Sequence, residues 1–267
     1  MAQTRTSGPN VLRDAYRKVV DNIATAAQRS GRQPGDIRMV AVTKTASPDQ
    51  IRTLVEMGHS DFGENRVQQL QQRVAVLEEF LTRRRTLGNP GGANEPTPKV
   101  RWHMIGHLQR NKVKQVIPLV QLIHSVDSLR LAEELHAFAA RSERTVEVLL
   151  QVNSSGEAAK SGIDVSTGVA APAVIHLAEQ IDTMIHLKLR GLMTIAPYSD
   201  NPEDARPCFA RTVELFQEVR SAKHGGGDFN IISMGMTGDY QVAIEEGANV
   251  VRIGRAIFGE QEQPEAV

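Results

Sequence analysis

The sequence predicts an α/β protein, and more particularly a (β/α)8 TIM barrel. Short runs rich in β-branched residues alternate with amphipathic stretches, which is the pattern of parallel β–α units. Eight such runs can be counted, and the length of 267 residues fits the roughly 250 residues that this barrel usually takes. Because periodicity does not show whether a sheet closes on itself, an open doubly wound sheet is the alternative.

The expected strands are short apolar runs, and each ends at a polar or glycine-containing loop. Parallel neighbours need a long crossover between them, so a helix is expected after each strand. In chain order the strands are expected at Ile37 to Thr43, Ser60 to Gly63, Val100 to Ile105, Leu122 to Val126, Val146 to Val152, Leu187 to Met193, Phe229 to Ser233 and Asn249 to Ile253.

The expected helices show apolar residues at helical spacing, and several have clear starting signals. Ser47 and Asn201 are capping residues, and each is followed by a proline that suits the first helical turn. The helices between strands are expected at Pro48 to Met57, Asn65 to Leu81, Ser128 to Arg141, Thr167 to Ile181, Pro202 to Ala222 and Asp239 to Glu246.

A further helix, Val11 to Arg29, is predicted before the first strand. After the eighth strand only Ala256 to Val267 remain, which is too short for a full closing helix. We therefore expect the leading helix to fill the gap beside the last strand. Its apolar residues at helical spacing are Leu12, Tyr16, Val19, Val20 and Ile23.

We interpret residues 1–267 as one domain, because neither an internal repeat nor a linker is visible. The stretch from Thr82 to Lys99 combines three arginines with a Gly-Asn-Pro-Gly-Gly run, and we expect it to be an exposed, flexible insertion. The sequence does not reveal the oligomeric state, and a monomer is the expectation.

Composition excludes several classes of function. The 31 basic and 31 acidic residues balance, with a pI near 7.1, so neither nucleic acid nor an anionic membrane is an expected partner. The first residues lack the apolar core of a secretory signal, and no run is long and apolar enough for a membrane span, so a cytoplasmic protein is expected. The single Cys208 excludes an internal disulfide and is interpreted as a packed thiol.

In such a barrel, chemistry belongs at the carboxyl ends of the strands, and unusual residues occur at these positions. Lys44 follows the first strand directly. At an apolar barrel mouth, loss of water would favour the neutral amine, which is a nucleophile toward aldehydes. Taken alone, Lys44 is more typical of a solvated residue at the end of a strand.

The loops after the last two strands have the composition of anion-binding loops. Ser233 to Asp239 contains two glycines and two hydroxyl residues, and Gly254 follows the eighth strand. Small residues let backbone N–H groups approach an oxyanion, and phosphates often bind at these two loops in this fold. Arg252, near the end of the eighth strand, needs an acceptor wherever it lies, either a carboxylate or a ligand such as a pyridine nitrogen.

Five segments, in order over nearly the whole chain, resemble the pyridoxal 5′-phosphate homeostasis protein family, also called the proline synthetase co-transcribed family. They are Ala41 to Lys44, Phe62 to Asn65, Trp102 to Lys112, Ser233 to Thr237 and Val251 to Gly254. That family resembles the N-terminal domain of alanine racemase, which has the same barrel.

The resemblance implies that pyridoxal 5′-phosphate (PLP) binds as a Schiff base on Lys44. It also implies that Arg252 faces the pyridine nitrogen and that Asn65 lies near the ring. The phosphate would lie among Ser233, Thr237, Gly254 and Arg255. Arg255 departs from the small hydroxyl residue usual in this family, so we expect only its backbone N–H at the phosphate.

The implied function is storage, buffering and delivery of PLP without established catalysis, with apo forms of PLP-dependent enzymes as partners. A racemase needs a second acid or base opposite the lysine, and the expected barrel leaves little chain for the domain that supplies it in racemases. Two alternatives are a PLP-dependent amino-acid racemase or weak lyase, and a Schiff-base aldolase without a cofactor. No metal site is expected, since the spacing of His103 and His107 falls on a strand and not on a helix.

Overall fold

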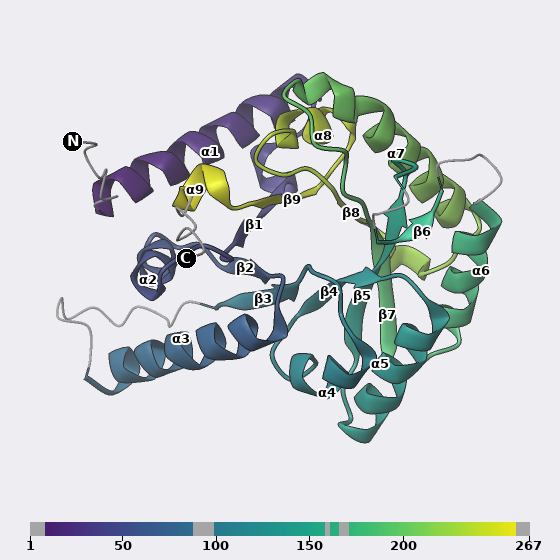
Figure 1. The fold of residues 1–267 in the computed structure, drawn as a ribbon, viewed down its shortest axis with the longest axis horizontal. Coiled ribbons are helices and arrows are strands. Elements are labelled where there is room, and N and C mark those ends of the chain that lie inside the picture. Colours follow the sequence, from purple (N-terminus) through teal and green to yellow (C-terminus); the bar gives the residue numbers. More distant parts are fainter. Residues whose placement is uncertain (1–8, 88–98, 158–160, 166–170, 260–267) are drawn as a thin grey trace, which may run out of the picture.

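A computed structural model describes residues 9–87, 99–157, 161–165 and 171–259 of the chain. In this part, eight parallel strands form a closed ring that is covered by helices on its outside (Figure 1). The order around the ring is β4-β3-β2-β1-β9-β8-β7-β5, and pairing of β4 with β5 closes it, which confirms the predicted barrel and excludes an open sheet. The ring strands are β1 (Arg38–Val42), β2 (Asp61–Glu64), β3 (Arg101–Met104), β4 (Leu122–Val126), β5 (Val146–Asn153), β7 (Leu187–Met193), β8 (Ile231–Ser233) and β9 (Val250–Ile253).

All eight predicted strands are present, and two of them, β4 and β7, have the predicted bounds. Most of the others begin one or two residues later than predicted, because strand ends are set by pairing and not by composition. One strand in the described residues was not predicted. The two-residue strand β6 (Ile163–Asp164) pairs with the end of β5, where Val152 lies opposite Ile163.

The helices agree with the predicted pattern but differ in detail. Helix α3 extends to Leu87, so the first part of the predicted insertion Thr82 to Lys99 is helical, and its residues 88–98 lie outside the described part. The predicted helix from Pro202 is divided into a 3-10 turn and α7, which has Pro207 in its first turn. Residues 166–170, at the predicted start of α6, also lie outside the described part. The α-helices are α1 (Pro9–Arg29), α2 (Pro48–Glu56), α3 (Val67–Leu87), α4 (Val113–Val116), α5 (Leu129–Arg141), α6 (Ala171–Asp182), α7 (Arg206–Ser221), α8 (Tyr240–Glu246) and α9 (Arg255–Phe258), and the 3-10 helices are η1 (Pro34–Asp36), η2 (Arg110–Lys112), η3 (Pro202–Ala205) and η4 (Gly226–Asp228).

Helix α1 packs beside the last strand, as predicted, and contacts α8 and α9 (Figure 1). Asn22 on α1 donates a 3.0 Å hydrogen bond to the hydroxyl of Tyr240, and Arg32 donates to the carbonyls of Ile244 and Ala248. Most of the predicted apolar face is buried, but Val20 is 40% exposed and lies outside this contact. The chain thus covers the seam of its ring with the helix that precedes the first strand.

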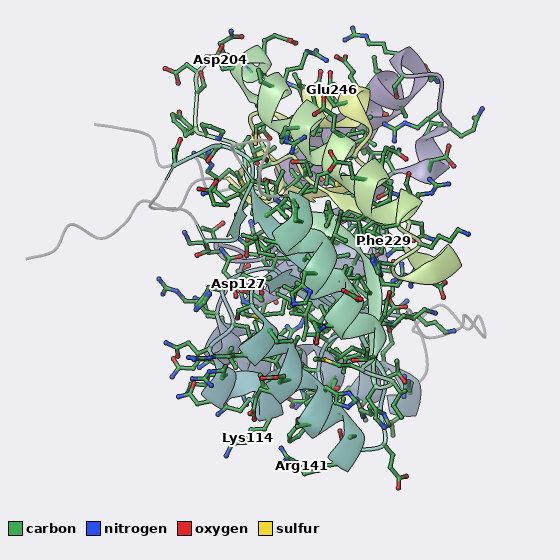
Figure 2. All side chains as sticks on the ribbon, turned by 90° about the vertical axis from the view of Figure 1, so that its right-hand side faces the viewer. Lys114, Asp127, Arg141, Asp204, Phe229 and Glu246 are labelled. Carbon is green, nitrogen blue, oxygen red and sulfur yellow. The ribbon has the colours of Figure 1, made fainter. Side chains whose placement is uncertain are left out.

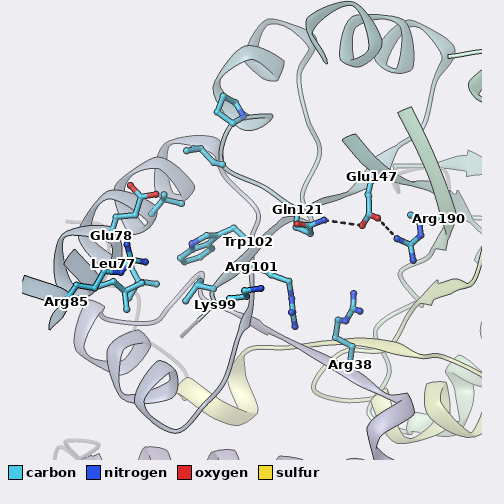
Figure 3. A pocket seen from close by; sticks show the side chains of 15 residues that line it. Arg38, Leu77, Glu78, Arg85, Lys99, Arg101, Trp102, Gln121, Glu147 and Arg190 are labelled. Atoms are coloured by element: carbon cyan, nitrogen blue, oxygen red, sulfur yellow. Dashed lines mark hydrogen bonds and ion pairs between the residues drawn. The ribbon is translucent and has the colours of Figure 1, made fainter. Parts of the chain in front are cut away.

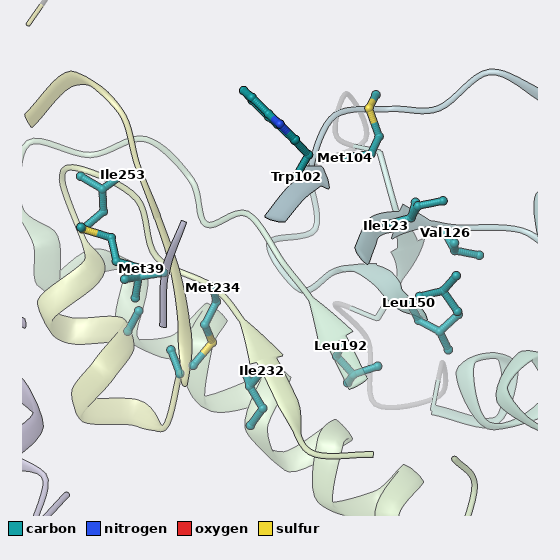
Figure 4. Packing of buried hydrophobic residues seen from close by; sticks show 14 of the residues in the cluster. Met39, Trp102, Met104, Ile123, Val126, Leu150, Leu192, Ile232, Met234 and Ile253 are labelled. Carbon is teal, nitrogen blue, oxygen red and sulfur yellow. The ribbon is translucent and has the colours of Figure 1, made fainter. Parts of the chain in front are cut away.

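Side chains that point away from the ring fill the layer between strands and helices. Met39, Trp102, Ile123, Leu150 and Ile232 are examples, all buried and each from a different strand (Figure 4). Inside the ring, a small separate cluster of apolar side chains, one from each of six strands, fills the centre of the barrel. Its members are Val40, Leu122, Leu149, Met193, Ile231 and Val250.

Charged side chains cover the outer faces of the helices, as the side view shows (Figure 2). Lys114 and Arg141 are near one end of this view, and Asp204 and Glu246 are near the other. In the described residues, no helix combines the length and the apolar character that crossing a bilayer would require.

Candidate functional site

Two adjoining cavities open at the carboxyl ends of the strands, where the fold predicts a site. The larger has a volume of about 450 Å³ and the smaller about 230 Å³. Arg252 lines both, as do Val42, Ile195 and Met236. The larger cavity is also lined by the predicted residues Lys44, Thr237, Gly254 and Arg255, and the smaller by Asn65.

Lys44 lies in the turn between β1 and α2, and its side chain is exposed at the edge of the larger cavity. The prediction that this amine is shielded from water at the barrel mouth is therefore wrong for the structure, in which the Lys44 side chain is exposed. The following helix is held by a capping box, because Ser47 Oγ accepts from Gln50 N at 3.2 Å and Gln50 Oε1 accepts from Ser47 N at 2.8 Å. The start of α2 thereby fixes where the Lys44 turn ends.

A buried ion pair holds the same turn from behind. Arg73 on α3 forms a 2.7 Å ion pair with Glu64 at the end of β2, and donates to the carbonyls of Ala46 at 2.9 Å and Lys44 at 3.4 Å. Thr43 also donates to Glu64, whose side chain is fully buried. We call Glu64 and Arg73 the loop clamp. No sequence motif indicates it, since its partners come from three separate elements.

Burial of the loop clamp affects the protonation of its acid. Burial raises the pKa of Glu64, while the hydrogen bond from Thr43 and the charge of Arg73 act in the opposite direction. Oε2 of Glu64 is buried and has no hydrogen-bond partner among the described residues. The carboxylate therefore depends on Arg73 for its compensating charge.

The loops after β8 and β9 meet beside Lys44. Ala256 N donates to Thr237 Oγ1 at 3.4 Å, and Met236 N donates to Asp239 Oδ1 at 2.5 Å. Gly235 has a φ of 93°, and a Cβ there would lie 2.6 Å from the Cβ of Ala243, so glycine is required at this turn. Burial raises the pKa of Asp239, against the Met236 hydrogen bond and the charge of Arg252.

Arg252 points into the barrel mouth. It is 4% exposed, and it donates to Ser233 Oγ at 2.7 Å and to the carbonyl of Thr194 at 2.8 Å. Burial lowers the pKa of Arg252 to about 10, with Asp239 acting in the opposite direction. The guanidinium therefore stays charged at neutral pH and can only donate.

Asn65 follows β2 and is exposed at the smaller cavity. The loop after β3 approaches it closely at Gly106, where an added Cβ would lie 2.3 Å from the carbonyl oxygen of Asn65. Only a glycine permits this approach, which brings the ends of β2 and β3 together.

Ser233 is the predicted residue that lines neither cavity. Its hydroxyl is fully buried and contacts Arg252 and, at 2.9 Å, His124 Nδ1. A second acid or base opposite the lysine could be a tyrosine, and two tyrosines are candidates. Tyr240 is buried and bonded to α1, whereas Tyr198 is 82% exposed and lines the larger cavity. Ile195 and Met236 line both cavities but were not predicted as site residues, because apolar residues on a cavity wall have no distinctive sequence pattern.

The opposite mouth of the barrel has a cavity of about 820 Å³ (Figure 3). Arg38, Arg101 and Arg190 point toward it, but two of these cations are already paired. Arg101 bonds Asp61, and Arg190 bonds Glu147. This end of a barrel commonly serves stability, so we place the candidate site at the Lys44 mouth.

Comparison with known proteins agrees with this geometry. Residues 16–262 match the family model described as alanine racemase, N-terminal domain. The alanine racemase of Corynebacterium glutamicum has a similar barrel, with a TM-score of 0.61 and 14% identity over 93% of this chain and 62% of that one. The fold and the family match thus place the chain in the class of alanine racemase-like barrels.

Relatives with higher sequence identity define a narrower family within this class. The pyridoxal phosphate homeostasis protein of Aquifex aeolicus is 35% identical over 91% of this chain and 96% of its own length. PipY of Synechococcus elongatus, solved with PLP bound, is 28% identical with a TM-score of 0.71, over 89% of this chain and 100% of that one. The chain belongs to the pyridoxal phosphate homeostasis protein family.

Proposed function

We propose that this protein binds PLP, holds it as a Schiff base on Lys44, and serves to store, buffer and deliver it without catalysis of its own. The observation on which this proposal rests is that Lys44, Arg252 and the loops after β8 and β9 face one cavity. The names of the relatives and the PLP-bound PipY support the same ligand. We also propose that the protein acts in the cytoplasm as a monomer.

The residues present fit such a ligand. The hydroxyl of Thr237 and the backbone of the two loops would hold the phosphate, since Gly238 leaves open space where a Cβ would lie. Gly254 approaches the backbone closely, because an added Cβ would lie 3.1 Å from the carbonyl oxygen of Val42. Arg252 would face the ring nitrogen, and Asn65 would lie near the ring in the adjoining cavity.

The proposed covalent bond between PLP and the protein would be a Schiff base on the amine of Lys44. PLP would supply an aldehyde carbon, and the Lys44 amine, after giving up a proton to the solvent that reaches it, would form a C=N bond with that carbon while the aldehyde oxygen leaves as water. The exposure of Lys44 gives water and acceptor proteins access for the reverse step. Arg252 donates without losing its own proton, which leaves the ring uncharged and a weak electron sink. Both features suit a carrier better than a catalyst.

Borohydride reduction followed by peptide mass spectrometry tests the proposal. Reduction should add one pyridoxyl phosphate group to the peptide that contains Lys44, and Lys44→Ala should abolish the addition. Lys114→Ala is the matched control, because Lys114 is an exposed lysine on α4 that lines neither mouth cavity, and its adduct should be complete (Figure 2). A full-stoichiometry adduct in Lys44→Ala would refute the assignment, and a colourless protein without an adduct would refute PLP binding.

A racemase or weak lyase is the second candidate, and the position of Tyr198 favours it, since this tyrosine and Lys44 line the same cavity. Incorporation of solvent deuterium at the α-carbon of several amino acids distinguishes the two functions. A carrier shows no exchange above that of free PLP. Exchange that is lost in both Lys44→Ala and Tyr198→Phe would establish an enzyme instead.

Delivery requires a recipient, and we propose apo forms of PLP-dependent enzymes as partners. The test mixes the PLP-loaded protein with an apo-enzyme and follows the recovery of enzyme activity. A carrier should transfer PLP faster than the rate at which free PLP released from it could be captured. Recovery at the rate of spontaneous release would show passive buffering only.

A further inference from the structure

A line of polar side chains crosses the interior of the barrel. His103 Nε2 lies 3.1 Å from Asp61 Oδ1, His103 Nδ1 lies 3.0 Å from His124 Nε2, and His124 Nδ1 lies 2.9 Å from Ser233 Oγ. Ser233 Oγ in turn accepts from Arg252 Nη1 at 2.7 Å. The line therefore joins Asp61, the first residue of β2, to the guanidinium of Arg252 at the Lys44 mouth of the barrel.

Each member of this line is buried, so each polar atom needs a partner. His103, His124 and Ser233 are fully buried, and Asp61 and Arg252 are 5% and 4% exposed. Both nitrogens of each imidazole are used within the line. At its far end Asp61 is held by Arg101, which donates to both carboxylate oxygens.

The chemistry of the two ends fixes the direction of the hydrogen bonds. Arginine can only donate and a carboxylate can only accept, while a hydroxyl or a neutral imidazole can do both. With neutral imidazoles, every atom is satisfied only when Arg252 donates to Ser233, Ser233 to His124, His124 to His103 and His103 to Asp61. Both histidines then carry their proton on Nε2.

The electrostatics of the interior favour these neutral forms. Burial lowers the pKa of His103, with Asp61 acting in the opposite direction. Burial lowers the pKa of His124 well below its ordinary value, and neighbouring His103 and Arg252 add to the effect. Burial acts to raise the pKa of Asp61, but the hydrogen bonds from Arg101 and His103 outweigh it and hold the pKa below its usual range.

We propose that Asp61, His103, His124 and Ser233 form a directional hydrogen-bond relay that positions the Arg252 guanidinium at the cofactor mouth. This inference rests on the proposed function, because it concerns the ring that Arg252 would face. Every dipole of the relay presents its acceptor end to Arg252, and this stabilises a buried cation that has no directly bonded carboxylate among the described residues. Ser233 is thereby assigned to the support of Arg252 and not to the phosphate.

The first test uses the protein without ligand. Long-range nitrogen–proton NMR spectra of imidazole-labelled protein at neutral pH should show both His103 and His124 neutral with the proton on Nε2. His103→Phe keeps the ring volume and removes both hydrogen-bonding atoms, so His124 should shift toward the Nδ1–H form. A charged His103, or an Nδ1–H His124 in the unmodified protein, would overturn the relay.

The second test compares two ligands, pyridoxal phosphate and pyridoxal. Ser233→Ala removes one hydrogen bond from a buried cation, so both ligands should bind about tenfold more weakly, by the same factor. Thr237→Ala, the matched loss of a hydroxyl at the phosphate loops, should weaken the phosphorylated ligand selectively. If Ser233→Ala weakened only the phosphorylated ligand, Ser233 would belong to the phosphate site and the relay would be wrong.

The two proposals fail in distinguishable ways. If the unmodified protein bound neither ligand, the proposed function would fall, while the NMR spectra would still decide whether the relay exists. If PLP bound to Lys44 but His124 carried its proton on Nδ1, the relay alone would fall. Circular dichroism of each variant identifies losses that arise from misfolding, and Ser233→Thr, which restores the hydroxyl, should recover binding.

Discussion

Removing Arg73 tests how the protein holds its reactive lysine. Arg73→Met keeps most of the length of the side chain but removes the ion pair to Glu64 and the hydrogen bonds to the carbonyls of Lys44 and Ala46. Because Glu64 is fully buried, the variant leaves an uncompensated carboxylate in the interior. Breaking a buried pair in this way costs about 3 kcal/mol of unfolding free energy.

A control variant on α3 shows whether the loss of stability is specific to Arg73 or follows the removal of any arginine from this helix. Arg83 forms an ion pair with Glu79 one turn along α3, and both side chains are mostly exposed. Arg83→Met should therefore change the unfolding free energy by no more than about 0.5 kcal/mol. Urea unfolding of the three proteins measures both values.

The cost of Arg73→Met should also depend on pH. Burial already raises the pKa of Glu64, and loss of Arg73 raises it further. A carboxyl with a raised folded-state pKa favours folding below its unfolded pKa of about 4.3, and this contribution is lost as the pH rises through the folded pKa. The difference between wild type and variant should therefore grow from pH 5 to pH 8. A cost equal to that of Arg83→Met, or one that does not change with pH, would refute the loop clamp.

Two further predictions concern stability around the mouth. Ser47→Ala should lower the unfolding free energy, measured by urea unfolding, by about 1 kcal/mol, because it removes a capping hydrogen bond. Ser128→Ala, at a helix start without a side-chain capping hydrogen bond, should lower it clearly less. Equal losses in the two variants would contradict the role of Ser47 as a cap. Gly106→Ala should lower the unfolding free energy, measured by thermal unfolding, by about 2 kcal/mol, because its Cβ would overlap the backbone of Asn65. The same variant should also form less of the Lys44 adduct. Gly35→Ala is the control and should be nearly neutral, because a Cβ at Gly35 would meet no atom within 4 Å.

The fold could be predicted because its signals are local. Strands such as β4 and β7 are mainly apolar runs with clear ends, and Ser47 caps α2 as its sequence predicts. The position of α1 followed from counting strands and the helices available to cover them. The extension of α3 to Leu87 was missed, because the arginine run suggested a loop although arginine is a good helix former.

The site could be predicted only in part. Lys44, which directly follows a strand, was placed at the mouth because parallel strands end on one side. The burial of Ser233 and the role of Arg73 depend on partners from distant elements, and sequence spacing does not reveal these. The exposure of Lys44 was also missed, since a strand pattern does not show how far a following turn protrudes.

The seam covered by α1 has a consequence for how the chain is made. Arg38 on β1 pairs with Val250 on β9, so β1 cannot complete its backbone pairing until nearly the whole chain has left the ribosome. Until then β1 and β8 are the two unpaired borders of a growing sheet, and such borders invite aggregation. The short strand β9 pairs with both of these borders, so the sheet keeps two open edges until the last of its strands has been made.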